Sequence, residues 1–147
     1  PDIPQIEFES FVKLRNMQGI DEKGILEFSF TDGDGDIGLY SWETTPPFDY
    51  NLFITYFEKQ NGEFKEVILT YYNDSTQQFD TNYFHSRIPI INSSDENQAL
   101  KGKIEIELDI NNPDSDYDTI RFDAYIKDRA LNESNTISTP EIIVKKQ

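Results

Sequence analysis

The stretch ILEFSF, at residues 25–30, alternates apolar and polar side chains from Leu26 onward. One face carries the apolar members and the other the polar ones, which are Leu26, Phe28 and Phe30 against Glu27 and Ser29. Successive side chains of a β-strand point to opposite sides of the sheet, whereas a helical stripe repeats every 3.6 residues. The stretch therefore predicts a strand with one buried face and one solvent-exposed face.

The same alternation recurs in KIEIELDI (103–110) and in TIRFDAYIKD (119–128). YNLFITYF (50–57) is apolar on both faces, which is typical of a central strand. No segment carries a convincing helical stripe. We expect eight strands, at residues 5–14, 25–32, 48–59, 63–72, 82–91, 101–110, 118–128 and 138–144.

Turn residues separate these segments. Asn61-Gly62 suits the two left-handed positions of a type I′ hairpin turn, and Pro89 would remove a hydrogen-bond donor from a ladder and so favours a sheet edge. Short strands in series without helices indicate a sandwich or a barrel. We predict an all-β fold, an immunoglobulin-like β-sandwich of seven to eight antiparallel strands, as a single domain over residues 1–147. A closed lipocalin-type barrel is the alternative.

The composition excludes several classes of function. Acidic residues outnumber basic ones by 28 to 13, giving a net charge of -15, which argues against nucleic-acid binding and against docking on anionic lipid. The absence of cysteine excludes disulfides and thiolate sites, and no apolar run is long enough to span a membrane. His85 is the only histidine, so neither a zinc site nor a serine triad is indicated.

The acidic stretch TDGDGDIGLYSWE, at residues 31–43, is the strongest candidate for a site. Asp32, Asp34 and Asp36 match positions 1, 3 and 5 of an EF-hand loop, and Glu43 matches position 12. Position 6 is Ile37 instead of glycine, and the flanking segments are predicted strands, so a true EF-hand is not expected. We expect either a Ca²⁺ loop without helices or a turn in which the aspartates cap backbone amides.

The predicted topology adds ligands to this loop. In an immunoglobulin-like sandwich, the loop after the second strand and the loop before the last strand lie at the same end. Asp128 is in phase with the buried face of its strand, and Asn132 follows in the loop. The predicted metal ligands are therefore Asp32, Asp34, Asp36, Glu43, Asp128 and Asn132.

Four aromatic residues, Tyr40, Trp42, Tyr71 and Tyr72, lie in or near predicted loops. We expect them to serve core and cross-strand packing. A sugar-stacking platform or a protein contact is the alternative.

Three stretches carry a resemblance to a known group: FSFTDGDGDIGL (28–39), RIPIINSSDENQALKGKIEIELDI (87–110) and DTIRFDAYIKDRALNESNTISTPEI (118–142). In these the chain resembles uncharacterised lipoproteins of Bacteroidetes-type bacteria, and the last stretch is also similar to the closing loop of bacterial immunoglobulin-like repeats. The resemblance implies export, a lipid anchor upstream of Pro1, and a place in the cell envelope, on the periplasmic or surface side of the outer membrane. It implies no activity.

From these features we expect a non-enzymatic binding or structural module, without catalytic or cofactor-binding residues, whose partner is an unidentified protein or glycan. The alternative is a hydrolase or glycan-processing accessory that uses acidic residues at the loop end.

Overall fold

The computed structural model describes residues 3–32, 35–90 and 100–147. Ten strands follow in chain order: β1 (Gln5–Arg15), β2 (Asp21–Asp32), β3 (Leu52–Gln60), β4 (Glu63–Glu66), β5 (Leu69–Asn73), β6 (Gln78–Asn82), β7 (Leu100–Asp109), β8 (Thr119–Ile126), β9 (Ile137–Ser138) and β10 (Ile142–Ile143). These described residues form no helix. Accordingly, the described part of the chain has no helical segment suited to crossing a membrane.

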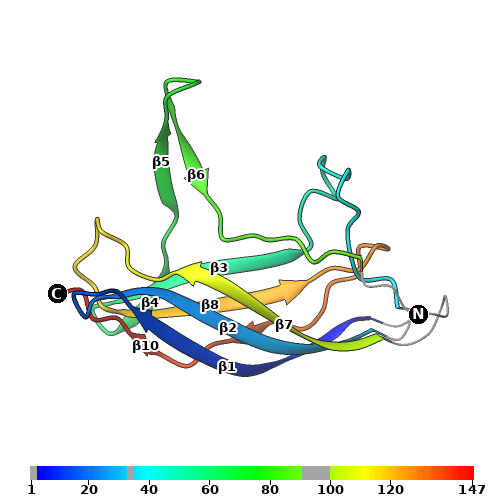
Figure 1. The fold of residues 1–147 in the computed structure, drawn as a ribbon, viewed down its shortest axis with the longest axis horizontal. Coiled ribbons are helices and arrows are strands. Elements are labelled where there is room, and N and C mark those ends of the chain that lie inside the picture. The colour runs from blue at the N-terminus through cyan, green and yellow to red at the C-terminus, as the bar shows by residue number, and fades with distance from the viewer. Residues whose placement is uncertain (1–2, 33–34, 91–99) are drawn as a thin grey trace.

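The strands form two principal antiparallel sheets (Figure 1). One has three strands in the order β1-β2-β7, and the other has five, in the order β10-β8-β3-β4 with β9 also paired to β8. Buried side chains from both sheets form a single hydrophobic cluster. The prediction of an all-β protein is confirmed, and the arrangement is sandwich-like.

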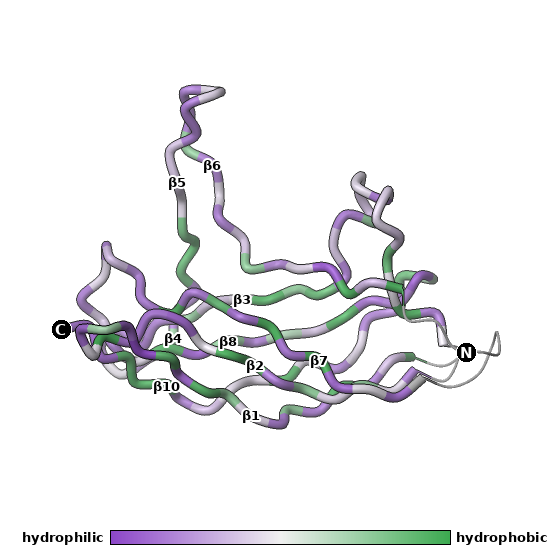
Figure 2. Tube along the Cα trace, viewed as in Figure 1, coloured by the Kyte–Doolittle hydropathy of each residue, from purple (hydrophilic) through white to green (hydrophobic). Residues whose placement is uncertain are grey.

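The predicted alternation of buried and exposed residues is observed on both sheets. Phe28 in β2 and Phe122 in β8 are at most 1% exposed, and their neighbours along each strand face outward. Apolar and polar residues alternate accordingly along these strands (Figure 2). The ring of Phe11 in β1 stacks on Phe122 with centroids 6.0 Å apart, so the two sheets pack directly on each other.

The Asn61-Gly62 prediction is confirmed. Both residues have positive φ angles, 55° and 88°, and Gln60 pairs with Glu63 across the two-residue turn. The turn therefore fixes the register of β3 against β4.

Three predicted strands differ from the observed ones. The expected strand 63–72 is divided between β4 and β5, because Val67 still donates its amide to the Tyr56 carbonyl (3.0 Å) before the chain leaves the sheet. Of the expected strand 82–91, Asn82 ends β6, and over residues 83–90 only isolated bridges form, at Ser86 and Pro89. The expected strand 138–144 is interrupted around Pro140, which gives the short strands β9 and β10.

The strands β5 and β6 pair only with each other among the described strands, and they project from the sandwich as a hairpin (Figure 1). We call residues 68–83 the arm. Five of its large apolar side chains are exposed: Ile68, Tyr71, Tyr72, Phe79 and Tyr83. Cross-strand packing is observed for Tyr72, whose ring meets Phe79 at 5.3 Å, but neither Tyr71 nor Tyr72 belongs to the core.

Candidate metal centre

Two buried aspartates face each other from the two sheets at one end of the core. Asp32 ends β2 in phase with Phe28 and Phe30 and is 1% exposed. Asp128 follows β8 in phase with Phe122 and is 3% exposed. Because each continues the inward face of its strand, the sequence periodicity that builds the core also places these carboxylates at its end.

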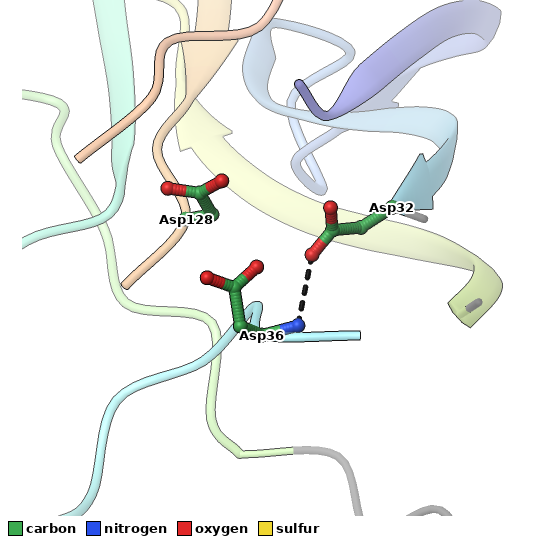
Figure 3. A group of neighbouring side chains, drawn as sticks. All are labelled: Asp32, Asp36 and Asp128. Atoms are coloured by element: carbon green, nitrogen blue, oxygen red, sulfur yellow. Dashed lines mark hydrogen bonds between the residues drawn. The ribbon is translucent and has the colours of Figure 1, made fainter. Parts of the chain in front are cut away.

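A third carboxylate comes from the loop after β2. Asp36 donates its amide to Oδ2 of Asp32 (2.9 Å), which folds the loop back over the end of the strand. Oxygen atoms of Asp32, Asp36 and Asp128 lie within 4.8 Å of one another, and the three side chains converge in Figure 3. The Oδ1 atom of Asp36 is buried and has no hydrogen-bond partner among the residues that the structure describes. We call these three residues the carboxylate cluster.

The electrostatics of the cluster favour a bound cation. Two unit charges 4.8 Å apart repel by about 3.5 kcal/mol in an effective dielectric constant of about 20. A cation bound among the three carboxylates would relieve this repulsion. Carboxylate oxygens are the preferred ligands of hard divalent cations, so the donor set fits such an ion.

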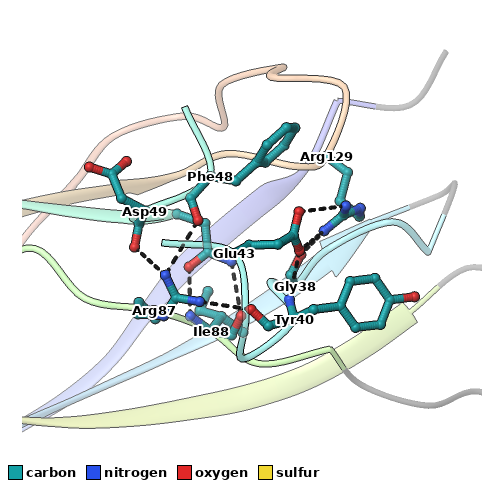
Figure 4. A network of polar contacts seen from close by, with 9 residues as sticks. Gly38, Tyr40, Glu43, Phe48, Asp49, Arg87, Ile88 and Arg129 are labelled. Carbon is teal, nitrogen blue, oxygen red and sulfur yellow. Dashed lines mark hydrogen bonds and ion pairs between the residues drawn. The ribbon is translucent and has the colours of Figure 1, made fainter. Parts of the chain in front are cut away.

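Arg129, which follows Asp128, directs its guanidinium hydrogen bonds away from the cluster, although its charge still acts on Asp36. Arg129 directs its guanidinium to Glu43, with Nη1–Oε1 and Nη2–Oε2 distances of 2.7 and 2.9 Å, and donates a further bond to the Gly38 carbonyl (Figure 4). This pairing, with the Tyr40 amide, lowers the pKa of Glu43 to about 2, and it raises the pKa of Arg129. Among the described residues, the hydrogen bond from Arg129 to the cluster comes from its backbone amide, which donates to the Asp36 carbonyl (3.0 Å).

The structure brings together only part of the predicted ligand set. Glu43 lies in the ion pair with Arg129, outside the carboxylate cluster. Asn132 orients Asp128, donating its amide to Oδ1 (2.8 Å) and its side-chain Nδ2 to Oδ2 (3.1 Å). Asp34 lies outside the described residues.

Two arginines, Arg87 and Arg129, hold the loop at residues 37–51. Arg87 donates to the carbonyls of Phe48, Asp49 and Tyr40 at 3.3, 2.6 and 2.9 Å, while Arg129 holds Glu43 (Figure 4). Sequence spacing gives no signal for these contacts, because the partners lie 38 to 86 positions apart.

The described residues thus form an all-β protein with two principal antiparallel sheets. Three carboxylates gather where these sheets end. Comparison of the chain with family models, with curated proteins and with solved structures finds no match.

Proposed function

We propose that this protein is a non-enzymatic binding or structural module of the cell envelope, with an immunoglobulin-like topology that bound calcium stabilises. The carboxylate cluster is the observation that carries the proposal, because its members come from both sheets and from the intervening loop. An ion at this point would tie the end of β2 and the loop after it to the segment after β8, which is distant in sequence.

Calcium fits this donor set better than the other common divalent cations. Ca²⁺ accepts six to eight oxygen ligands in flexible geometry, whereas Mg²⁺ requires near-ideal octahedral coordination and retains several waters. Zinc prefers nitrogen and sulfur donors, and the cluster offers only carboxylates. Three carboxylates leave room for backbone carbonyls and water to complete a calcium shell.

Burial weighs against the hydrolase alternative. A carboxylate pair that cleaves a glycosidic bond must touch its substrate on both sides of that bond. Asp32 and Asp128 are almost fully covered, so their exposed surface is too small to meet a polymer. The same burial suits an ion, which needs only its ligands.

The cell-envelope location and the upstream lipid anchor belong to the same proposal. Their support is the resemblance of residues 28–39, 87–110 and 118–142 to Bacteroidetes-type lipoproteins. The immunoglobulin-like topology is supported by the two packed antiparallel sheets and by the meeting of Asp36 and Asp128 at one end.

Thermal unfolding in calcium and in chelator tests the site. A ligand at a hundredfold excess over Kd stabilises the native state by about 2.7 kcal/mol, which for a chain of this size raises Tm by roughly 5–10 °C. Asp128→Asn should abolish that rise. In chelator the variant loses a hydrogen bond from Asn132 as well as one of three mutually repelling charges, so its own Tm in chelator is the baseline for its response to calcium.

Asp74→Asn, in the exposed turn of the arm, is the matched control and should keep the full response to calcium. If calcium raises Tm no more than magnesium or an equal ionic strength of sodium chloride does, the aspartates are turn-forming residues and the proposal of a calcium site is wrong.

A further inference from the structure

Trp42, the only tryptophan of the chain, is 74% exposed at the surface of the loop at residues 37–51. Its ring stacks on Tyr40 with centroids 4.6 Å apart and an interplanar angle of 9°. Tyr40 is itself 41% exposed. Core packing, which the sequence analysis expects for both residues, is therefore not observed.

The stack continues inward from Tyr40. The Arg129 guanidinium carbon lies 5.1 Å from the centroid of the Tyr40 ring and 5.1 Å from that of Phe48. Four planar side chains are thus in contact one after another, and we call them the aromatic pile: Trp42, Tyr40, Arg129 and Phe48. Its outermost member, Trp42, carries the greatest exposure.

The aromatic pile is held in place before any ligand arrives. Glu43 fixes Arg129 with two hydrogen bonds and accepts the Tyr40 amide at 2.7 Å. Arg87 holds the carbonyls of Tyr40 and Phe48. A side chain that is already ordered loses little conformational entropy on binding, so this platform can contribute most of its contact energy to a ligand.

We propose that the outer face of Trp42 binds a pyranose ring of a neutral glycan. The face of an aromatic ring is electron-rich, and the axial C–H groups of a sugar ring are electron-poor, so the two stack favourably. The residues around Trp42 are polar as well as exposed, with hydroxyl groups on Ser41, Thr44 and Thr45 that match those of a sugar.

Size and charge favour this ligand over the others. A stable protein interface buries about 800 Å² on each partner around an apolar centre, whereas here the exposed indole ring has exposed hydroxyl-bearing residues close to it in the chain. The net charge of -15 repels nucleic acids and acidic polysaccharides. A single flat ring matches one neutral sugar ring.

This assignment deepens the proposed binding function by naming a ligand class, and its test does not require the calcium site. Because Trp42 is the sole tryptophan, its emission reports directly on what covers it. The full chain is titrated with cellohexaose, xylohexaose, mannohexaose and maltohexaose, in calcium and separately in chelator. We expect at least one of them to give a saturable blue shift, with an affinity measured independently by calorimetry.

Trp42→Ala should weaken that affinity at least tenfold, while Trp42→Phe, which keeps a flat face, should retain part of it. Tyr83→Ala removes another exposed ring, stacked on His85 instead of on the aromatic pile, and should leave affinity unchanged.

The proposal is overturned if none of the four glycans binds, if binding survives Trp42→Ala, or if the emission shift follows protein concentration and so reports self-association. A glycan response in chelator alongside no calcium effect on Tm would refute the calcium site and leave this inference standing.

Discussion

At the scale of single residues, two like charges lie directly opposite each other on the outer face of the three-stranded sheet. Glu27 in β2 is paired in register with Glu105 in β7. The hydrogen bond that protonated Glu105 donates to Glu27, together with the negative charge of Glu27, raises the pKa of Glu105. Lys103 approaches Glu27 only to 3.8 Å. Like charges opposite each other destabilise a sheet, so Glu105→Gln should raise Tm at pH 7.

The raised pKa of Glu105 predicts how the gain in Tm from Glu105→Gln should depend on pH. A carboxyl whose folded pKa lies above its unfolded pKa binds more protons in the native state, so native stability increases as pH falls between those two values. The advantage of Glu105→Gln should therefore disappear near pH 4. Glu107→Gln, two residues along the same face, is the control and should give no such gain. An equal gain from both variants would mean that overall charge, instead of this pair, is responsible.

The roles of individual carboxylates could be predicted from sequence only where strand phase determines them. Asp128 continues an alternating apolar strand, so its burial followed directly from the period of two. The spacing of Glu43 suggested a metal ligand, yet it pairs with Arg129, 86 positions away. Local spacing contains no information about a cation that the fold brings from another loop.

At the scale of elements, the long alternating strands were predictable because their period is repeated many times. The observed β2 and β8 correspond to predicted segments 25–32 and 118–128, although β2 starts earlier, at Asp21. The strands predicted at residues 63–72 and 82–91 differ from the observed ones for a physical reason. Strand propensity persists through Val67 and Leu69, but hydrogen-bond partners change there, and propensity does not specify a partner.

The arm gives an element-scale prediction. Both of its ends meet the sandwich at Tyr56, through the Val67 amide (3.0 Å) and the Phe84 ring (5.6 Å). A six-residue glycine-serine linker, which reaches about 20 Å, can therefore replace residues 70–83 and keep Leu69, which packs against the core. Because β5 and β6 contact chiefly each other, we expect Tm to change by no more than about 3 °C.

Phe84→Ala changes a residue just beyond the arm and serves as a comparison for that deletion. Its ring packs against Tyr56 and Phe122, so its loss should cost about 2 kcal/mol of unfolding free energy in a urea titration. Loss of cooperative unfolding on removing the arm would show instead that the arm is part of the sandwich's folding unit.

At the scale of the whole molecule, the buried carboxylates at the two ends of the sandwich have different surroundings. β2 has 12 residues, so at about 3.3 Å per residue Asp21 and Asp32 are separated by roughly 36 Å. Asp32 belongs to the carboxylate cluster, whereas Asp21 is fully buried beside Lys13 and Arg15, each at 3.2 Å. One end thus has a carboxylate cluster that could hold a metal ion, and at the other end the chain's own cations pair with the buried carboxylate.

Asp21→Asn tests whether these ends are independent. Burial raises the pKa of Asp21, but the Lys145 amide (2.8 Å) and the two cationic side chains outweigh it and lower the pKa below its ordinary value. The carboxylate therefore stabilises the native state fully above its unfolded pKa, and that contribution is lost as pH falls through the lower folded value.

At pH 7 the substitution should cost about 2 kcal/mol in urea titrations, since it weakens hydrogen bonds to charged groups. Sites so far apart should not couple, so the gain from calcium should match that of the unmodified protein within about 0.5 kcal/mol. A larger difference would mean that the strand transmits strain between the two ends, and the sandwich would then respond to calcium as one unit.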